Sequence, residues 1–274
     1  MAEATPVDLR RHWPAAAAIG GAAGLLSGLL GIGGAAILVP GMVDILGMSQ
    51  HRAAGTSLLA MLPTAAVAAI VYAQGDQTSW PLIVLFSITA VAGASIGARV
   101  SSRLPGLVLR RIFGVCLLLI ALRLLVPGGA SEADAISVDL FAQATEITAG
   151  EGLLGLVAGF LSGLLGIGGA QILTPGMVYL FAIPQKVAQG ISVACIVPTA
   201  IAGAYQHYRQ GNVDTRVGLV LIPTSIAAGA LGAAFVHLVD APTLRFGFGI
   251  FLVYAGTRML APRLWTGLFR RLRP

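Results

Sequence analysis

Two glycine-rich segments have the composition of a backbone loop that binds an anion. Each holds three glycines within four positions: Gly31, Gly33 and Gly34 in the first, and Gly166, Gly168 and Gly169 in the second. Each glycine costs a helix about 1 kcal/mol relative to alanine, so we expect the helix to break there. A helix that restarts after the break offers unpaired N–H groups and a positive dipole end to an anion. The alternative is a tight kink that only packs one helix on another.

Polar side chains near these segments are the candidates for completing such a site. Gln171 follows the second glycine group, where the first has Ala36, and a carboxamide inside an apolar segment needs partners. We predict that Gln171 contacts substrate; the alternative is a hydrogen bond between helices. The other candidates are the hydroxyl residues Thr56, Ser57, Thr64, Ser192 and Thr199. Thr64 and Thr199 each follow a proline, so they either line the cavity or bond the backbone that the proline frees.

The sequence offers little for catalysis or metal binding. Its two cysteines, Cys116 and Cys195, both fall inside apolar runs and are typical of packing residues. The chain has no H-E-x-x-H motif, no paired aspartates and no cysteine–histidine pair. We therefore predict no catalytic residues, no metal site, no cofactor and no enzymatic activity.

The sequence segments that contain the glycine groups occur twice in the chain. SGLLGIGGAAILVPGMV runs from Ser27 to Val43, and SGLLGIGGAQILTPGMV runs from Ser162 to Val178. Extended back to Gly24 and Gly159, the two copies agree at 17 of 20 positions. Such agreement indicates an internal repeat.

Composition places the repeats in a membrane. The 274 residues are 57% hydrophobic and 10% charged, with a mean hydropathy of +0.88, whereas soluble domains carry about 25% charged residues. Apolar runs lie at about 14–47, 53–73, 80–101 and 107–127, and again at about 152–183, 187–208, 216–237 and 242–261. We predict an all-α integral membrane protein with about 8–10 membrane helices. Each repeat is a glycine-broken helix or hairpin followed by three transmembrane helices.

Basic residues favour an inverted orientation of the two repeats. With the N-terminus inside, 14 of the 17 Lys and Arg residues lie in cytoplasmic loops, and only Arg123, Lys186 and Arg245 lie outside. Parallel repeats would place ten inside. We predict a membrane repeat at 13–127, an extracytoplasmic linker at 128–150, a second repeat at 151–262 and a basic cytoplasmic tail at 263–274. Both termini are then cytoplasmic.

Glycines spaced four apart indicate where helices pack closely. They are Gly20, Gly24 and Gly28 in the first repeat, and Gly155, Gly159 and Gly163 in the second. Residues at this spacing share one helix face, and small ones let two helix backbones approach. We expect a packing role for all six.

Three features together resemble the TauE/SafE sulfite exporter family. They are the duplicated phrase G-x-x-G-x-G-G-x-x-x-x-x-P, the G-T-S-L that runs from Gly55 to Leu58, and the proline within the following span. The resemblance covers roughly residues 15–262. It implies transport of sulfite, a sulfonate such as sulfoacetate, or a similar organosulfur or carboxylate anion across a prokaryotic inner (plasma) membrane. The second repeat reads Gly190-Ile191-Ser192, so the hydroxyl of Thr56 has no counterpart.

The sequence therefore predicts a secondary transporter that works by alternating access between its two repeats. The expected partners are a small anionic substrate and the lipid bilayer, with no nucleic acid despite the net charge of +6; a homodimer is left open. The alternatives are an anion channel and, third, an intramembrane enzyme. The sequence does not identify the anion, the direction of transport or the coupling ion, nor does it separate a re-entrant hairpin from two short spans.

Overall fold

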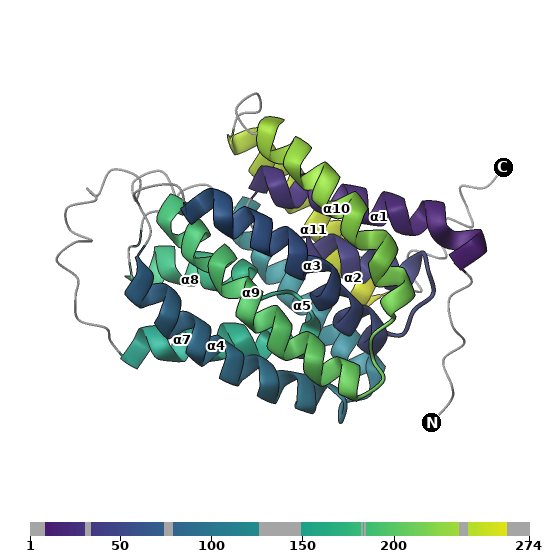
Figure 1. The fold of residues 1–274 in the computed structure, drawn as a ribbon, viewed down its shortest axis with the longest axis horizontal. Coiled ribbons are helices and arrows are strands. Elements are labelled where there is room, and N and C mark those ends of the chain that lie inside the picture. Colours follow the sequence, from purple (N-terminus) through teal and green to yellow (C-terminus); the bar gives the residue numbers. More distant parts are fainter. Residues whose placement is uncertain are drawn as a thin grey trace.

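The computed structural model of the chain describes residues 9–30, 34–73, 79–125, 149–181, 183, 185–235 and 241–261. Within these ranges all regular secondary structure is helical, in ten helices (Figure 1). The first half contains α1 (Leu9–Leu30), α2 (Ala35–Asp44), α3 (Gln50–Ala73), α4 (Trp80–Ser101) and α5 (Gly106–Leu125). The second half contains α7 (Ala149–Leu165), α8 (Ala170–Phe181), α9 (Gln185–Arg209), α10 (Thr215–Phe235) and α11 (Ala241–Leu260).

The two halves have the same order of helices: one long, one short, then three long. The starts of α2, α3, α4 and α5 each recur 135 residues later, as the starts of α8, α9, α10 and α11. This is the offset between the duplicated sequence phrases. The all-helical, repeated organisation predicted from the sequence is therefore confirmed at the level of individual helices.

Each short helix runs back along the long helix before it. Gly34 packs against Ala23, and Gly41, one turn from the end of α2, packs against the earlier residue Ile19. In the second half, Gly176 likewise packs against Leu154, near the start of α7. Of the two forms that the sequence left open, a broken helix or a hairpin, each half thus contains a helical hairpin.

The hairpins pack on helices of the opposite half. Helix α1 lies on α10, and α7 lies on α4. A Cβ built on Gly24 would lie 2.6 Å from Ser225 Cα, and one on Gly159 would lie 2.5 Å from Ala90 Cα. The predicted packing role is confirmed for Gly20, Gly24, Gly155, Gly159 and Gly163; the environment of Gly28 lies outside the description. Helices α3 and α9 also pack together, as do α5 and α11.

Large apolar side chains lie on the outside of the bundle. Ile70, Ile88 and Leu219 are 63%, 65% and 70% exposed, respectively. Three described segments are long and apolar enough to cross a membrane: Trp80–Ser101, Val187–Arg209 and Thr215–Gly232. Helices Ala35–Asp44 and Ala149–Leu165 are apolar but shorter. An outer surface of this kind is suited to lipid.

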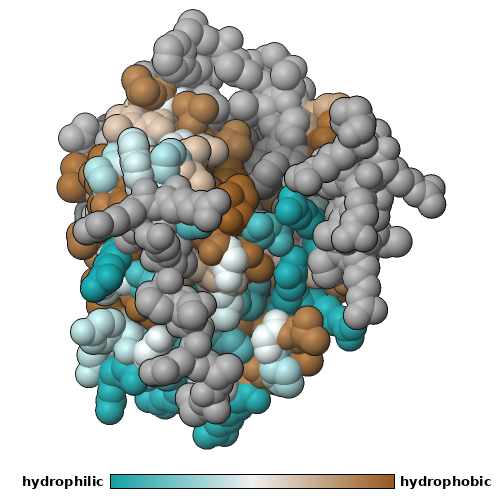
Figure 2. All heavy atoms as spheres, turned by 90° about the vertical axis from the view of Figure 1, so that its right-hand side faces the viewer, coloured by the Kyte–Doolittle hydropathy of each residue, from teal (hydrophilic) through white to brown (hydrophobic). Residues whose placement is uncertain are grey.

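Ionic contacts gather at one end of the bundle, which we call the polar end and define by Asp44, Arg52, Arg110, Asp214 and Arg258. Figure 2, which views the molecule from the right-hand side of Figure 1, shows hydrophilic residues over the lower and middle parts of that face and hydrophobic residues above them. The end of α2 and the starts of α3, α5 and α10 all lie here, because these residues belong to them or directly adjoin them.

The predicted linker lies outside the described residues except for Ala149 and Gly150, which begin α7, and the predicted tail lies wholly outside them.

Candidate functional site

The second glycine break has a backbone that requires glycine. Helix α7 ends at Leu165 and α8 begins at Ala170. Between them, Gly166, Gly168 and Gly169 have φ angles of 77°, 77° and 81°. Side chains disfavour this left-handed region by roughly 1–2 kcal/mol per residue. The expectation that these glycines interrupt a helix is therefore confirmed in this half.

Helix α3 of the first half closes over this break. Ser57 Oγ lies 2.6 Å from Gly166 O, to which it donates, and 2.8 Å from Ala54 O in its own helix. A Cβ on Gly166 would lie 2.5 Å from Ala54 Cα, and one on Gly168 would lie 2.5 Å from Met61 Cε. Gly166 thus faces backbone, which cannot move aside, whereas Gly168 faces the flexible tip of a methionine.

The first glycine break is described only in part. Gly31 and Gly33 lie outside the described residues. Gly34 caps the start of α2 with φ −80° and ψ 0°, so it differs from Gly169 in backbone conformation. The helix starts are nevertheless alike, since Leu38 N donates to Gly34 O at 3.0 Å and Leu173 N donates to Gly169 O at 2.9 Å.

Gln171 is the unusual side chain of the second break. It lies in the first turn of α8 and is only 3% exposed. Within the described part of the chain, neither its Oε1 nor its Nε2 has a hydrogen-bond partner. The interhelical hydrogen bond that was the alternative expectation is thus absent among these residues. An unpaired buried amide costs roughly 1–3 kcal/mol, which a bound ligand would offset.

Ser192 and Thr56 hold distant segments together. Thr174 Oγ1 donates to Ser192 Oγ at 2.8 Å, which joins α8 to α9 inside the core. Thr56 Oγ1 accepts the backbone N–H of Asp214 at 2.9 Å, which joins α3 to the start of α10. Both hydroxyls therefore have protein partners in this conformation.

The two threonines that follow prolines bond the backbone of their own helices. Thr64 Oγ1 donates to Met61 O at 2.9 Å, and Thr199 Oγ1 donates to Cys195 O. This is one of the two roles that the sequence left open for them. Ser57 is thus the candidate hydroxyl in direct contact with the second glycine break. No hydrogen bond among the described residues joins Gln171 to another candidate.

Three polar residues that are not among the sequence's site candidates also form contacts between segments. His207 is fully buried, with Nε2 2.8 Å from Gly163 O near the end of α7. Asp214 binds Arg52, and Thr174 binds Ser192. Thr174 could have been noticed in the sequence, because it is one of the three positions at which the two 20-residue copies differ, with Val39 as its counterpart.

Few of the buried polar side chains in the described residues are charged. Apart from the ion-paired Asp214 and the imidazole of His207, the buried polar side chains of the described residues are neutral amides and hydroxyls. No group of three His, Cys, Asp or Glu residues that could hold a metal occurs within the described ranges. An anion at the second break would therefore meet backbone N–H groups and neutral donors.

Comparison with known proteins identifies the chain's relatives. The family model described as Sulfite exporter TauE/SafE matches residues 2–124 and again 152–273, so each half matches separately. The probable membrane transporter protein YunE of Bacillus subtilis is 29% identical over 219 residues, which cover 76% of this chain and 80% of that protein. The probable membrane transporter protein YdhB of the same organism is 23% identical over 241 residues, covering 86% and 96%.

A shorter match adds a relative from a second bacterium. A probable membrane transporter protein of Haemophilus influenzae is 34% identical over 115 residues, which cover 39% of this chain and 44% of the relative. No solved structure matches the chain.

Proposed function

Because the chain belongs to the TauE/SafE sulfite exporter family, which consists of multi-pass membrane transporters rather than enzymes, we propose that it moves a small organosulfur or carboxylate anion across the inner membrane. The proposed substrates are sulfite, a sulfonate such as sulfoacetate, and anions of similar size. The proposed mechanism is alternating access by two inverted repeats.

The observation that carries the substrate class is the unpaired carboxamide of Gln171 beside a glycine break. Its Nε2 is a buried donor without a described partner, in the first turn of a 12-residue helix. The start of such a helix carries the equivalent of about half a positive charge. Neutral donors and a partial charge are suited to one compact negative charge. The three flanking glycines allow the backbone to approach that anion closely.

The opposed directions of the two hairpins support an inverted arrangement. Helix α2 ends at the polar end, where Asp44 binds Arg110 and Arg258. Helix α7 has its last turns near that same end, since Gly163 O binds His207 near the end of α9. One hairpin thus enters from the polar end and the other from the opposite end. Because most basic residues lie at the polar end, we place that end, and both termini, in the cytoplasm.

Transport into sealed vesicles tests the proposal. Purified protein is reconstituted into liposomes, and uptake of sulfite, sulfoacetate, isethionate, taurine and acetate is measured against protein-free liposomes. We expect saturable uptake of at least one sulfonate or carboxylate anion, and faster uptake when the same anion is preloaded inside. Flux that rises linearly with concentration and shows no counter-transport would instead establish a channel.

A further inference from the structure

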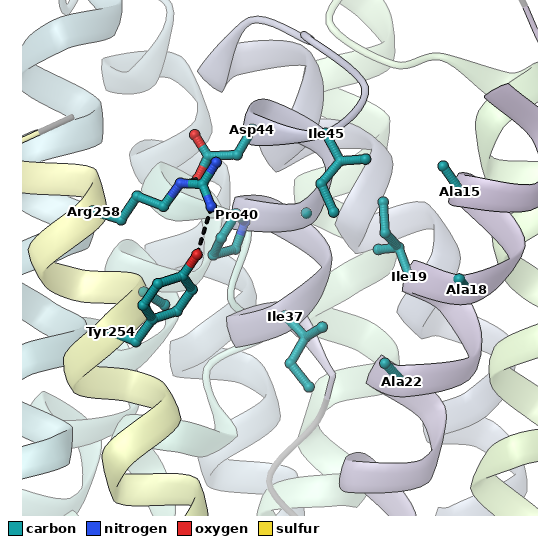
Figure 3. Close-up of a pocket in the computed structure, with 12 residues that line it drawn as sticks. Ala15, Ala18, Ile19, Ala22, Ile37, Pro40, Asp44, Ile45, Tyr254 and Arg258 are labelled. Atoms are coloured by element: carbon teal, nitrogen blue, oxygen red, sulfur yellow. Dashed lines mark hydrogen bonds and ion pairs between the residues drawn. The ribbon is translucent and has the colours of Figure 1, made fainter. Parts of the chain in front are cut away.

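A cavity of about 310 Å³ lies at the polar end, between α1, α2 and α11 (Figure 3). It is distinct from the second glycine break, which involves α3, α7 and α8. Along α1 it is lined by Ala15, Ala18 and Ala22, which follow one face of the helix. At its other side, Asp44 ends α2 while Tyr254 and Arg258 project from α11 (Figure 3).

At the charged side of the cavity, the lining residues Asp44 and Arg258 form a cluster with the adjacent Arg110, and this cluster carries a net positive charge. Asp44 Oδ1 accepts from Arg110 Nη2 at 2.8 Å, and Asp44 Oδ2 lies 3.1 Å from Arg258 Nε. One carboxylate therefore faces two guanidinium groups. Arg258 Nη1 also donates to Tyr254 Oη at 2.6 Å. These contacts use two of the five N–H donors of Arg258, whose side chain remains 32% exposed.

The rest of the cavity is apolar and elongated. Its length follows α1 from Ala15 to Ala22 and α2 from Ile45 back to Ile37. Eight residues of helix rise about 10–12 Å. The alanines leave this wall shallow, and Ala18 and Ala22 are exposed. A flexible aliphatic chain fits such a groove, whereas a compact hydrophilic anion would leave its walls uncovered.

The charged part and the apolar part of the cavity follow each other in the same order as the headgroup and the acyl chain of a lipid. The charged part lies near the ends of α2 and α11, which in a bilayer would lie near the lipid headgroups. The apolar part runs from there toward the middle of the bundle. A bound molecule would therefore place an anionic group at the surface and a hydrocarbon chain inward, which is how the lipids of the surrounding leaflet are oriented.

We propose that this cavity binds an anionic phospholipid, with the phosphate at Arg258 and one acyl chain along the alanine face of α1. The net positive charge selects an anionic headgroup over a zwitterionic one. The inference depends on the chain being in a membrane and not on which anion it transports.

Thermal unfolding in a neutral detergent tests the site. The measured quantity is the difference in melting temperature between added phosphatidylglycerol and phosphatidylcholine with identical acyl chains. We expect phosphatidylglycerol to raise the melting temperature by several degrees more than phosphatidylcholine does. Arg258→Gln removes the phosphate contact, and Ala18→Phe fills the apolar part without touching the ion pairs. Each variant should lose this difference.

Two matched controls separate the site from general effects. Arg209 lies over Tyr205 as Arg258 lies over Tyr254, each with 5.9 Å from Cζ to the ring centroid, but Arg209 does not line the cavity. Ala92 is exposed on α4, as Ala18 is on α1. Arg209→Gln and Ala92→Phe should keep the full difference between the two lipids.

Several results would overturn the proposal. Equal stabilisation by both lipids would remove the headgroup preference. A difference that persists in Arg258→Gln and Ala18→Phe would place the lipid elsewhere. Inorganic phosphate or sulfite that reproduces the whole shift and displaces the lipid would identify a site for a soluble anion. A lipid-dependent doubling of mass that Ala18→Phe abolishes would identify an interface with a second copy of the chain.

Discussion

Arg52 and Asp214 form an ion pair between the two halves of the chain, with 2.6 Å between Arg52 Nη2 and Asp214 Oδ2. Asp214 also caps the start of α10, because its Oδ1 accepts the N–H of Val217 at 3.2 Å. Its own N–H donates to Thr56. The starts of α3 and α10 are thus fixed to each other at the polar end.

Arg52→Gln should lower the free energy of unfolding by roughly 1–3 kcal/mol, because it leaves a mostly buried carboxylate without its cation. The side chain of Asp214 is only 8% exposed. Arg209→Gln, at an exposed position of the same end, should change stability by less than about 0.5 kcal/mol. Denaturant unfolding in detergent compares the two. Equal stability of both variants would show that the pair contributes nothing to the fold.

Alanine substitutions at the second glycine break should differ in severity. Gly166→Ala adds a Cβ against the backbone of Ala54, as well as the strain of a positive φ. Gly169→Ala adds the strain alone, about 1–2 kcal/mol, since the nearest atom to its Cβ is 3.5 Å away. Gly168→Ala should lie between them, because Met61 Cε can move. Melting temperatures of the three variants test this order, and equal losses would contradict the described geometry.

The positions of several helices could be predicted from the sequence, because the length of each apolar run determines where a membrane-spanning helix can form. The apolar run at 80–101 is helix α4 (Trp80–Ser101), and the run at 53–73 lies within α3 (Gln50–Ala73). The turn direction at each glycine break could not be predicted. It depends on φ angles that glycine leaves unrestricted and on packing such as that of Gly34 against Ala23.

Parts of the candidate site were harder to predict, because their partners come from distant segments. His207 lies near the end of an apolar run, where a histidine is typically interfacial, yet packing against α7 buries it completely. Nothing in the local sequence indicates that Gly163 O, 44 residues away, is its partner. Gln171 was identifiable because a carboxamide inside an apolar repeat stands out against Ala36 in the other copy.

Cysteine labelling tests the proposed topology. Ser102 follows α4 near the polar end, and Ser79 precedes α4 at the opposite end. In a variant that lacks Cys116 and Cys195, Ser102→Cys should react with an impermeant maleimide only in inside-out membrane vesicles. Ser79→Cys should react only in intact cells or spheroplasts, from the outside. The reverse pattern would move the polar end, and with it both termini, to the outside.

Gln171→Ala should weaken anion binding without weakening the fold. Its amide has no described protein partner, so truncation breaks no described hydrogen bond, and the unfolding free energy should stay unchanged or rise. Affinity for the transported anion should fall by roughly 1–3 kcal/mol, as expected for the loss of one hydrogen bond to a charged group. Alanine is also the residue at the equivalent position of the first repeat, Ala36.

Thr174→Val is the matched control, since it lies one turn further along α8 and also restores the first repeat's residue, Val39. It removes the hydrogen bond to Ser192, so stability should fall by about 0.5–1.5 kcal/mol while anion affinity changes little. Isothermal titration with the transported anion and thermal unfolding measure both quantities in both variants. Gln171→Ala should therefore lower anion affinity and not stability, whereas Thr174→Val should lower stability and not anion affinity. If Gln171→Ala bound the anion as tightly as the unaltered protein, the unpaired carboxamide would have no part in substrate binding.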